Sequence, residues 1–310
     1  MRSLAAYVSN VPHSAFGMPH MLFYGRPGTG KTTCVDLLAR AIFATKALRE
    51  RCVLRLNASD ERGIGAVRTR IKTFCDVAPP SEAPFKLVVL DECDNMTQVA
   101  QFALRRMMEA DVSSTALRKP RFILMCNYLS RIIAPIASRC SQVRFEPIAI
   151  DKIAAHLDSV AKRERWSSVS QATLHEVARV ASGDMRSALT LLQSLLRLWG
   201  NEACPERVPE LVGDVPREIV DALLRACMRK SVRGVTAHVR ALVHREAYSA
   251  EAIFRALLPL VLQCDALSEK NRALVSIKVA KAEHAFKKSA DEFFQVLSVA
   301  IYVRKLHQSQ

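Results

Sequence analysis

The sequence predicts an α/β domain, a parallel sheet with helices on both faces, followed by two all-helical domains. Three observations support this prediction. Apolar runs alternate with amphipathic segments over residues 20–146, a glycine-rich loop joins the first run to the first helix, and β signals fade after Pro147. We therefore expect three domains, at residues 1–147, 148–205 and 216–310.

The glycine-rich loop is Gly25-Arg26-Pro27-Gly28-Thr29-Gly30-Lys31-Thr32, which fits the phosphate-loop pattern. It lies between the apolar run Met21–Tyr24 and a helical pattern that starts at Thr33. The glycines let the backbone wrap around an anion, so that loop N–H groups and the helix N-terminus face the phosphates. We expect Lys31 to reach the β- and γ-phosphates, Thr32 to ligate Mg²⁺, and the adjoining Thr33 to lie at the nucleotide. A chance match has odds on the order of 1%, so the loop predicts nucleotide binding.

Four more apolar runs predict strands, at residues 52–57, 85–90, 122–127 and 142–145. The helices between them carry basic side chains. Arg68 and Lys72 lie one turn apart on an amphipathic helix at residues 66–75, and Arg106 lies on a helix that Thr97 is expected to cap.

Beyond Pro147 the apolar spacing is helical. Helices are expected at residues 150–166, 171–181 and 185–199. A linker with several prolines is expected at residues 201–216, and about five helical segments are expected from Glu218 onward.

Polar residues follow the predicted strands where ligands bind to parallel sheets. Asp91 follows the run at 85–90, as a carboxylate that holds Mg²⁺ through water beside the Thr32 hydroxyl would. Glu92 is a candidate to polarise an attacking water, and Asn127 a candidate to bond the γ-phosphate or to orient that water. The alternatives are an acidic helix-cap cluster at 91–94 and a strand-end turn asparagine.

Two arginines are candidates for phosphate contacts. Arg139, in Ser138-Arg139-Cys140, lies too far along the chain to be assigned to its own loop, so it is a candidate arginine finger for a neighbouring subunit. Arg186 begins a helix that is expected to cover the phosphates. For both, the alternative is an ordinary exposed arginine.

The composition favours an anionic partner. Lys and Arg number 45 against 30 Asp and Glu, a net charge of +15, although a generally basic protein has the same balance. The nine cysteines include no Cys-x-x-Cys pair, which indicates reduced thiols inside the cell. We find no apolar run of the roughly 18 residues that a membrane span needs, and Met1–Pro19 lacks the apolar core of a signal peptide. A cytosolic or nuclear protein without membrane contact is expected.

Five stretches make the pattern more specific. They are Leu56–Ile64, the acidic box Asp91–Asp94, Ala103–Arg106, Arg121–Ile133 and Ser138–Cys140. In order and spacing they resemble the small subunits of replication factor C, clamp-loader ATPases of the AAA+ class. The resemblance is strong from about Pro19 to Leu198 and weaker through the C-terminal helices.

This resemblance implies a fold, partners and a cellular role. The fold is an AAA+ phosphate-loop domain, then a helical lid and a helical collar that holds the complex together. The partners are the other replication factor C subunits in a hetero-pentamer, the sliding clamp PCNA and primer-template DNA. ATP binding with Mg²⁺ and its hydrolysis drive clamp loading in DNA replication and repair, in the nucleus.

The resemblance also implies residue roles. It makes Gly25–Thr32 the Walker A loop, Asp91 and Glu92 the Walker B pair, Asn127 sensor 1, Arg139 the arginine finger in trans and Arg186 sensor 2. It also makes three basic residues candidates to line the DNA channel through phosphate contacts, namely Arg68, Lys72 and Arg106.

The chain departs from the family pattern in four places. An N-terminal box that helps to hold adenine is absent, so we expect either a start at an internal methionine or poor adenine binding. Arg26 replaces a usual proline, Cys93 replaces a usual alanine, and the loop at 111–120 is longer than usual.

Two alternative functions remain open. One is a mainly structural clamp-loader subunit with weak nucleotide binding. The other is a different AAA+ DNA-remodelling ATPase, such as a branch-migration helicase, which does not account for Ser59–Ile64.

Overall fold

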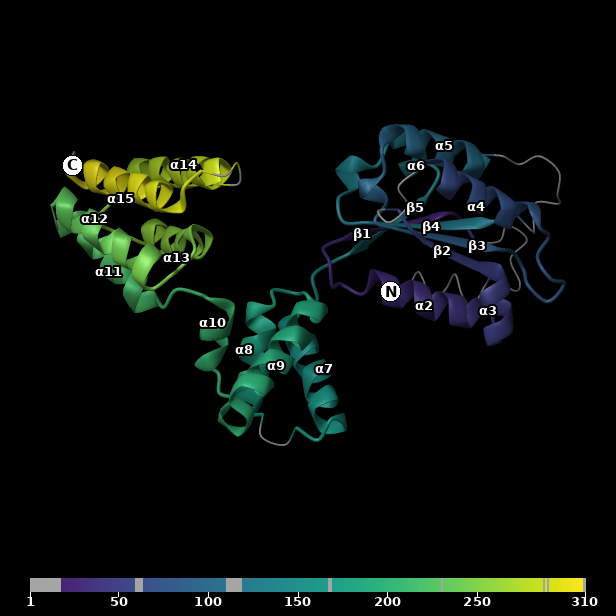
Figure 1. Ribbon diagram of the computed structural model, residues 1–310, viewed down its shortest axis with the longest axis horizontal. Helices are drawn as coiled ribbons and strands as arrows, with labels where there is room; N and C mark the ends of the chain where they lie inside the picture. Colours follow the sequence, from purple (N-terminus) through teal and green to yellow (C-terminus); the bar gives the residue numbers. More distant parts are fainter. Residues whose placement is uncertain are drawn as a thin grey trace. The chain divides into compact units, whose positions relative to one another are not determined.

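A computed structural model describes residues 18–58, 64–109, 119–166, 169–229, 231–286, 288 and 290–308 (Figure 1). They fall into two compact units. The first runs to Leu157 and includes Ala181–Leu189, and the second contains Asp158–Val180 and continues from Thr190. Among the described residues, no helix is both long and apolar enough to cross a bilayer. The three expected domains stay a prediction.

The described part of the first unit contains one sheet of five parallel strands, in the order β2-β3-β4-β1-β5. They are β1 (Met21–Gly25), β2 (Val53–Asn57), β3 (Leu87–Asp91), β4 (Arg121–Cys126) and β5 (Ser141–Phe145). In the register, Asn57 pairs with Asp91, Tyr24 with Cys126 and Gly25 with Phe145. All five strands therefore end at the same edge, where open α/β sheets bind ligands. The predicted sheet is confirmed.

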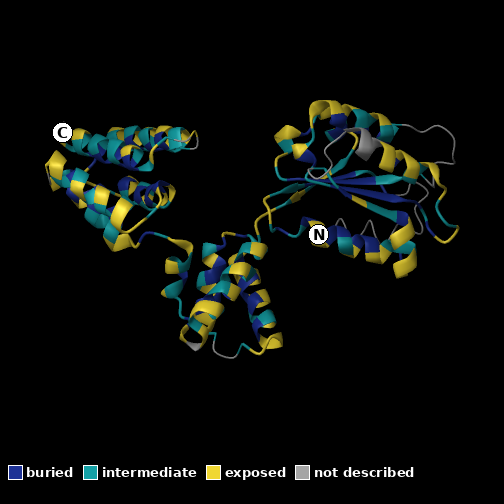
Figure 2. Ribbon diagram, in the orientation of Figure 1, coloured by how far each residue is buried: buried dark blue, intermediate teal, exposed yellow. Residues whose placement is uncertain are grey.

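Helices cover both faces of this sheet (Figure 1). On one face lie α2 (Lys31–Ile42) and α3 (Lys46–Cys52), and on the other lie α4 (Ile64–Asp76), α5 (Gln98–Glu109) and α6 (Ala134–Ala137). Successive strand residues point to opposite faces. Accordingly Phe23 packs in the core with α2, whereas Leu22 packs in the core with α4 and α5. The central strands β3, β4 and β1 are the most continuously buried elements of this unit (Figure 2).

The remaining α-helices fall into two sets. The earlier set is α7 (Ile150–Arg163), α8 (Gln171–Val180), α9 (Met185–Trp199) and α10 (Arg207–Val212). The later set is α11 (Arg217–Arg229), α12 (Val232–Arg240), α13 (Ala250–Leu262), α14 (Glu269–Phe286) and α15 (Glu292–Gln308). The later set shares one core, which contains Phe254, Val275 and Val299. It confirms the five expected helical segments, and a short π-helical stretch, Ala241–Arg245, follows α12.

Two helices of more than four residues differ from the sequence expectation. The first is α3, capped by the Thr45 hydroxyl, which accepts a bond from Leu48 N at 3.2 Å. It buries only Cys52, so it has almost no apolar stripe. The second is α10, which lies within the expected linker at 201–216 and packs against α8. Val208 is the one fully buried side chain of this helix. The expected long loop at 111–120 lies largely outside the described residues.

Docking of α10 predicts a local stability effect. Val208→Ala removes two methyl groups from a buried contact, so it should lower the free energy of unfolding by about 1–2 kcal/mol. Trp166 and Trp199 both lie in the second unit and are the chain's two tryptophans, so urea unfolding followed by tryptophan fluorescence reports on this region. Val212→Ala, on the same helix but 36% exposed, should change little. Equal losses in the two variants would contradict docking through Val208.

Candidate nucleotide-binding site

The loop after β1 has the backbone form of an anion cradle. Gly28 and Gly30 have φ values of +66° and +93°, in the left-handed region that favours glycine. Gly30 caps α2, and the ideal Cβ position there meets nothing within 4 Å, so its surroundings are open. The Thr29 hydroxyl donates to Arg26 O at 2.8 Å and closes the turn. The loop therefore presents the first N–H groups of α2 to an open space.

Lys31 ties the loop to the next strand of the sheet. Its ammonium donates to Gly25 O at 2.8 Å, Arg26 O at 2.9 Å and Asn127 Oδ1 at 2.9 Å. Burial lowers the pKa of Lys31, and the nearby Asp91 carboxylate opposes that shift. The three bonds fix a positive charge at the carboxyl edge, between the ends of β1 and β4.

Thr32 and Asp91 form an oxygen pair at the same edge. The Thr32 hydroxyl lies 3.5 Å from Asp91 Oδ2, as a long hydrogen bond. Hydroxyl and carboxylate oxygens are the donors that Mg²⁺ prefers in proteins. Thr32 is exposed and Asp91 partly exposed, so this donor set fits Mg²⁺.

Glu92 has strained backbone geometry. Its φ of +54° is left-handed, which is uncommon for a residue other than glycine and costs on the order of 1–3 kcal/mol. Its N–H donates to Asp91 Oδ1 at 2.9 Å, and its Oε2 accepts from Asn95 Nδ2 at 3.3 Å. The Glu92 side chain is partly exposed at the carboxyl edge of the sheet.

Asp94 has a role that the sequence interpretation missed. It is buried, and its Oδ2 accepts hydrogen bonds from the N–H groups of Asn127 and Tyr128, both at 3.2 Å. The α5 cap is instead the predicted Thr97, whose hydroxyl accepts from Ala100 N at 3.3 Å. Asp94 therefore fixes the turn that carries Asn127. The sequence shows that Asp94 belongs to the acidic box, but it does not reveal its partners, which lie more than 30 residues away.

The start of α9 lies directly against the loop. Met185 N donates to Gly28 O at 3.1 Å, and a Cβ on Gly28 would overlap the Asp184 carboxylate. Asp184 Oδ1 also accepts from the N–H groups of Arg186 and Ser187 and so caps the helix. This packing brings Arg186 near the site, where its charge contributes to lowering the pKa of Lys31, after burial.

Arg139 is not brought to this edge. It follows α6 and precedes β5, so it lies at the amino end of that strand, about 15 Å of strand away from the carboxyl edge. The predicted basic residues Lys72 and Arg106 are exposed on α4 and α5, helices that contact each other. Arg68 belongs to α4 too, but its side chain lies outside the described part. The roles of these residues stay predictions.

Comparison with known proteins places this site in a family. Residues 21–148 match the ATPase family associated with various cellular activities (AAA), and residues 215–301 match the replication factor C C-terminal domain. Replication factor C subunit 4 of Homo sapiens is 39% identical over 302 residues, which cover 94% of this chain and 80% of that protein. The chain belongs to the replication factor C family of AAA ATPases.

Other relatives in this family come from plants and archaea. Replication factor C subunit 2 of Oryza sativa is 36% identical over 290 residues, which cover 91% of this chain and 83% of that protein. Replication factor C small subunit 1 of Pyrobaculum aerophilum is 50% identical over 179 residues, 58% of this chain and 52% of that protein.

These matches confirm the resemblance seen in the sequence, and the AAA match supports an ATPase. The sequence pattern is similar to the fourth subunit type of animals, and the human relative carries that number.

The strain at Glu92 predicts a difference between two small replacements. Glycine adopts a left-handed backbone freely and alanine does not. We expect Glu92→Gly to have a free energy of unfolding about 1 kcal/mol above that of Glu92→Ala, measured by calorimetry of the sheet-containing unit. A Glu92→Ala variant that is the more stable of the two would contradict the left-handed geometry.

Proposed function

We propose that this chain is an ATPase subunit of a clamp loader. In this proposal it binds ATP with Mg²⁺, assembles with other replication factor C subunits, and loads the sliding clamp PCNA onto primer-template DNA. The observation that carries the proposal is the shared edge at which Lys31, the Thr32–Asp91 pair and Asn127 meet, in a chain of this family. A different class of AAA+ machine is not supported, because residues 215–301 match the replication factor C C-terminal domain.

Each residue of the edge has a proposed role. The N–H groups of the loop from Gly25 to Thr33 hold the phosphates, and Lys31 neutralises their charge. Thr32 and Asp91 hold Mg²⁺, which supplies electrostatic stabilisation of phosphoryl transfer. Glu92 accepts a proton from the attacking water and Asn127 orients it. The other two proposed contacts are Arg26 and Arg186, which add positive charge around the phosphates.

Hydrolysis is proposed to depend on assembly. Arg139 lies at the far edge of its own sheet, so it completes a neighbouring subunit's site instead. The helical set from α11 to α15 corresponds to the replication factor C C-terminal domain and is proposed to join the subunits as the collar. No subunit then hydrolyses ATP efficiently without its neighbour.

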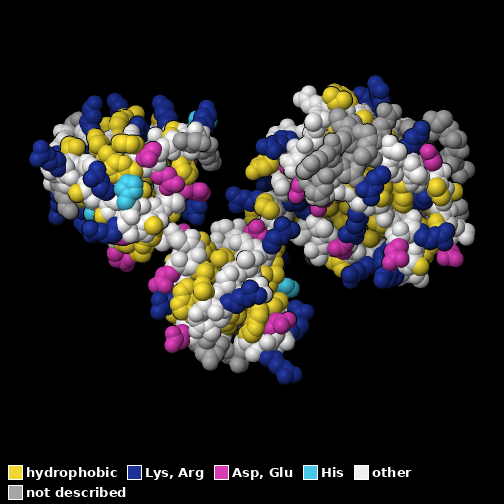
Figure 3. Space-filling view, in the orientation of Figure 1, with side chains coloured by type: hydrophobic (Ala, Val, Ile, Leu, Met, Phe, Trp, Pro, Cys, Tyr) yellow, Lys and Arg dark blue, Asp and Glu magenta, His cyan; other side chains and the backbone are white. Residues whose placement is uncertain are grey.

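DNA is proposed to contact α4 and α5 through Arg68, Lys72 and Arg106. These side chains would bind phosphates and read no sequence. Net charge alone does not locate this surface, because Lys and Arg are spread over all parts of the face seen in Figure 3. A nuclear role in replication and repair is proposed from the eukaryotic relatives. The archaeal relatives do not bear on localisation, because archaeal cells have no nucleus.

The nucleotide site is tested by two replacements with opposite patterns. Lys31→Ala removes the buried ammonium, so we expect ATP affinity to fall by about 10- to 100-fold. Glu92→Gln keeps the shape of the side chain, so binding should persist while hydrolysis falls by about 100-fold or more.

Equilibrium binding of a fluorescent ATP analogue and single-turnover hydrolysis measure the two effects. Lys46→Ala, an exposed lysine on α3, is the control and should match wild type. An ATP affinity equal to that of wild type in Lys31→Ala would contradict the proposed role of Lys31 in nucleotide binding. It would favour the alternative of a mainly structural subunit.

The DNA surface is tested by the salt dependence of binding. Replacing Arg68 and Lys72 together with alanine should reduce the slope of log K against log salt by nearly two, since each phosphate contact contributes about 0.9. The matched control is Arg40→Ala with Lys46→Ala, two exposed basic residues on the helices of the opposite face. Both double variants are measured in the assembled complex on primer-template DNA. Equal slopes in the two would show that Arg68 and Lys72 contact no phosphate.

A further inference from the structure

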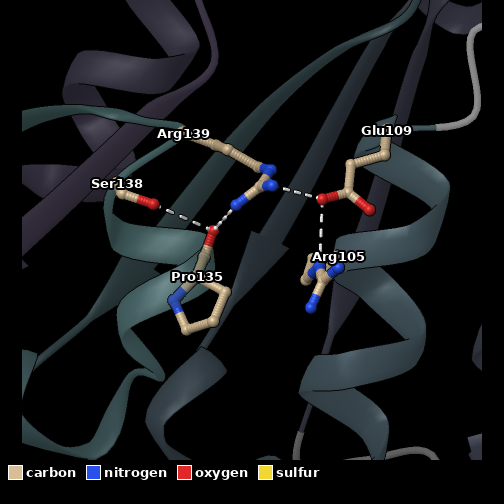
Figure 4. Close-up of polar contacts among 5 residues, drawn as sticks. All are labelled: Arg105, Glu109, Pro135, Ser138 and Arg139. Atoms are coloured by element: carbon tan, nitrogen blue, oxygen red, sulfur yellow. Dashed lines mark hydrogen bonds and ion pairs between the residues drawn. The ribbon is translucent and has the colours of Figure 1, made fainter.

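Arg139 is held from two sides within its own subunit (Figure 4). Its NH1 donates to Pro135 O at 2.7 Å, and its NH2 pairs with Glu109 Oε1. Arg105 Nε donates to the same carboxylate oxygen at 3.0 Å. The carboxylate of Glu109, at the end of α5, therefore joins an arginine of its own helix to one that follows α6.

These contacts fix the guanidinium of Arg139 through two of its nitrogens. A guanidinium has five N–H donors, so the bonds to Pro135 O and Glu109 Oε1 leave donors for a phosphate. Its side chain is 39% exposed. The hydrogen bond from Arg105, more than the charges of the two arginines, holds the pKa of Glu109 below its ordinary value. Glu109 is therefore an anion at neutral pH and keeps its hold on Arg139.

Helix stability does not account for Glu109. A carboxylate in the last turn of α5 lies at the negative end of the helix dipole, where it is unfavourable. The order Arg105 then Glu109 is also the weaker orientation of an i, i+4 ion pair. Ion pairs this exposed contribute little to folding. The cluster instead has the geometry of a support for the Arg139 side chain.

We propose that Glu109, braced by Arg105, is a positioning residue that presents Arg139 to the nucleotide site of the neighbouring subunit. The inference rests on the proposed function, in which Arg139 acts in trans. A guanidinium held in one orientation loses less entropy when it binds a phosphate, and its planar fork suits two parallel bonds. Glu109 itself touches no reacting atom. It acts through Arg139 alone.

The test is a double-mutant cycle in the assembled complex. Only the site that faces this subunit's Arg139 is left active, the phosphate-loop lysines of the others being replaced. We expect Arg139→Ala to reduce kcat by about 1,000-fold or more. Glu109→Ala should reduce kcat by about 10- to 100-fold with KM for ATP unchanged, and Glu109→Gln, which keeps an acceptor oxygen, should lie between it and wild type. The double variant should be no slower than Arg139→Ala alone.

A matched control separates positioning from a general surface effect. Glu50→Ala removes another exposed i, i+4 carboxylate, paired with Lys46 on α3, and should leave kcat unchanged. Each complex is checked for full assembly by mass photometry before its kinetics are compared.

The outcomes distinguish this inference from the proposed function. If Arg139→Ala slows hydrolysis and Glu109→Ala does not, the positioning role is overturned while the trans role stands. An increase in kcat in Glu109→Ala would mean that the carboxylate holds Arg139 back, and it would also overturn the positioning role. The positioning role would likewise be overturned if the double variant were slower than Arg139→Ala alone. If Arg139→Ala has no effect, the trans role itself fails, and the positioning role fails with it.

Discussion

The hydrogen bonds of the Lys31 ammonium are the interaction on which the candidate site depends. They join the loop after β1 to Asn127 at the end of β4, so two neighbouring strands share one buried charge. Burying an ammonium is costly unless it is hydrogen-bonded, and three oxygen acceptors offset that cost here. The arrangement needs β1 and β4 to be adjacent and to end level, which the observed register provides. The order of the strands in the sheet therefore decides whether Lys31 can reach Asn127.

The rest of the edge is built around this charge by contacts between distant segments. Asp94 fixes the turn that holds Asn127, Glu92 has a left-handed backbone directly after Asp91, and Gly28 leaves room for Asp184 at the start of α9. Strain of this kind persists only where the surroundings determine the backbone. The candidate site is therefore pre-formed, whereas Arg139 lies beyond the amino end of β5, away from it.

Much of this could be predicted from the sequence because it is written in local patterns. The apolar runs gave the five strands, the loop spacing gave Lys31 and Thr32, and Thr97 was identified as a cap. The helices α3 and α10 were not predicted, because each buries a single side chain and so has no periodic apolar pattern. Three further features could not be predicted for another reason, namely the left-handed Glu92, the bonds of Asp94 and the pairing of Glu109 with Arg139. They depend on tertiary contacts or on a backbone form that residue type does not favour.

Binding of a nucleotide with Mg²⁺ at this edge can be measured by titrating the wild-type chain with ATP in a calorimeter. We expect saturable binding of one ATP per chain, displaced by ADP and weakened when Mg²⁺ is removed with a chelator. Absence of saturable binding, or binding that does not respond to Mg²⁺, would contradict this expectation.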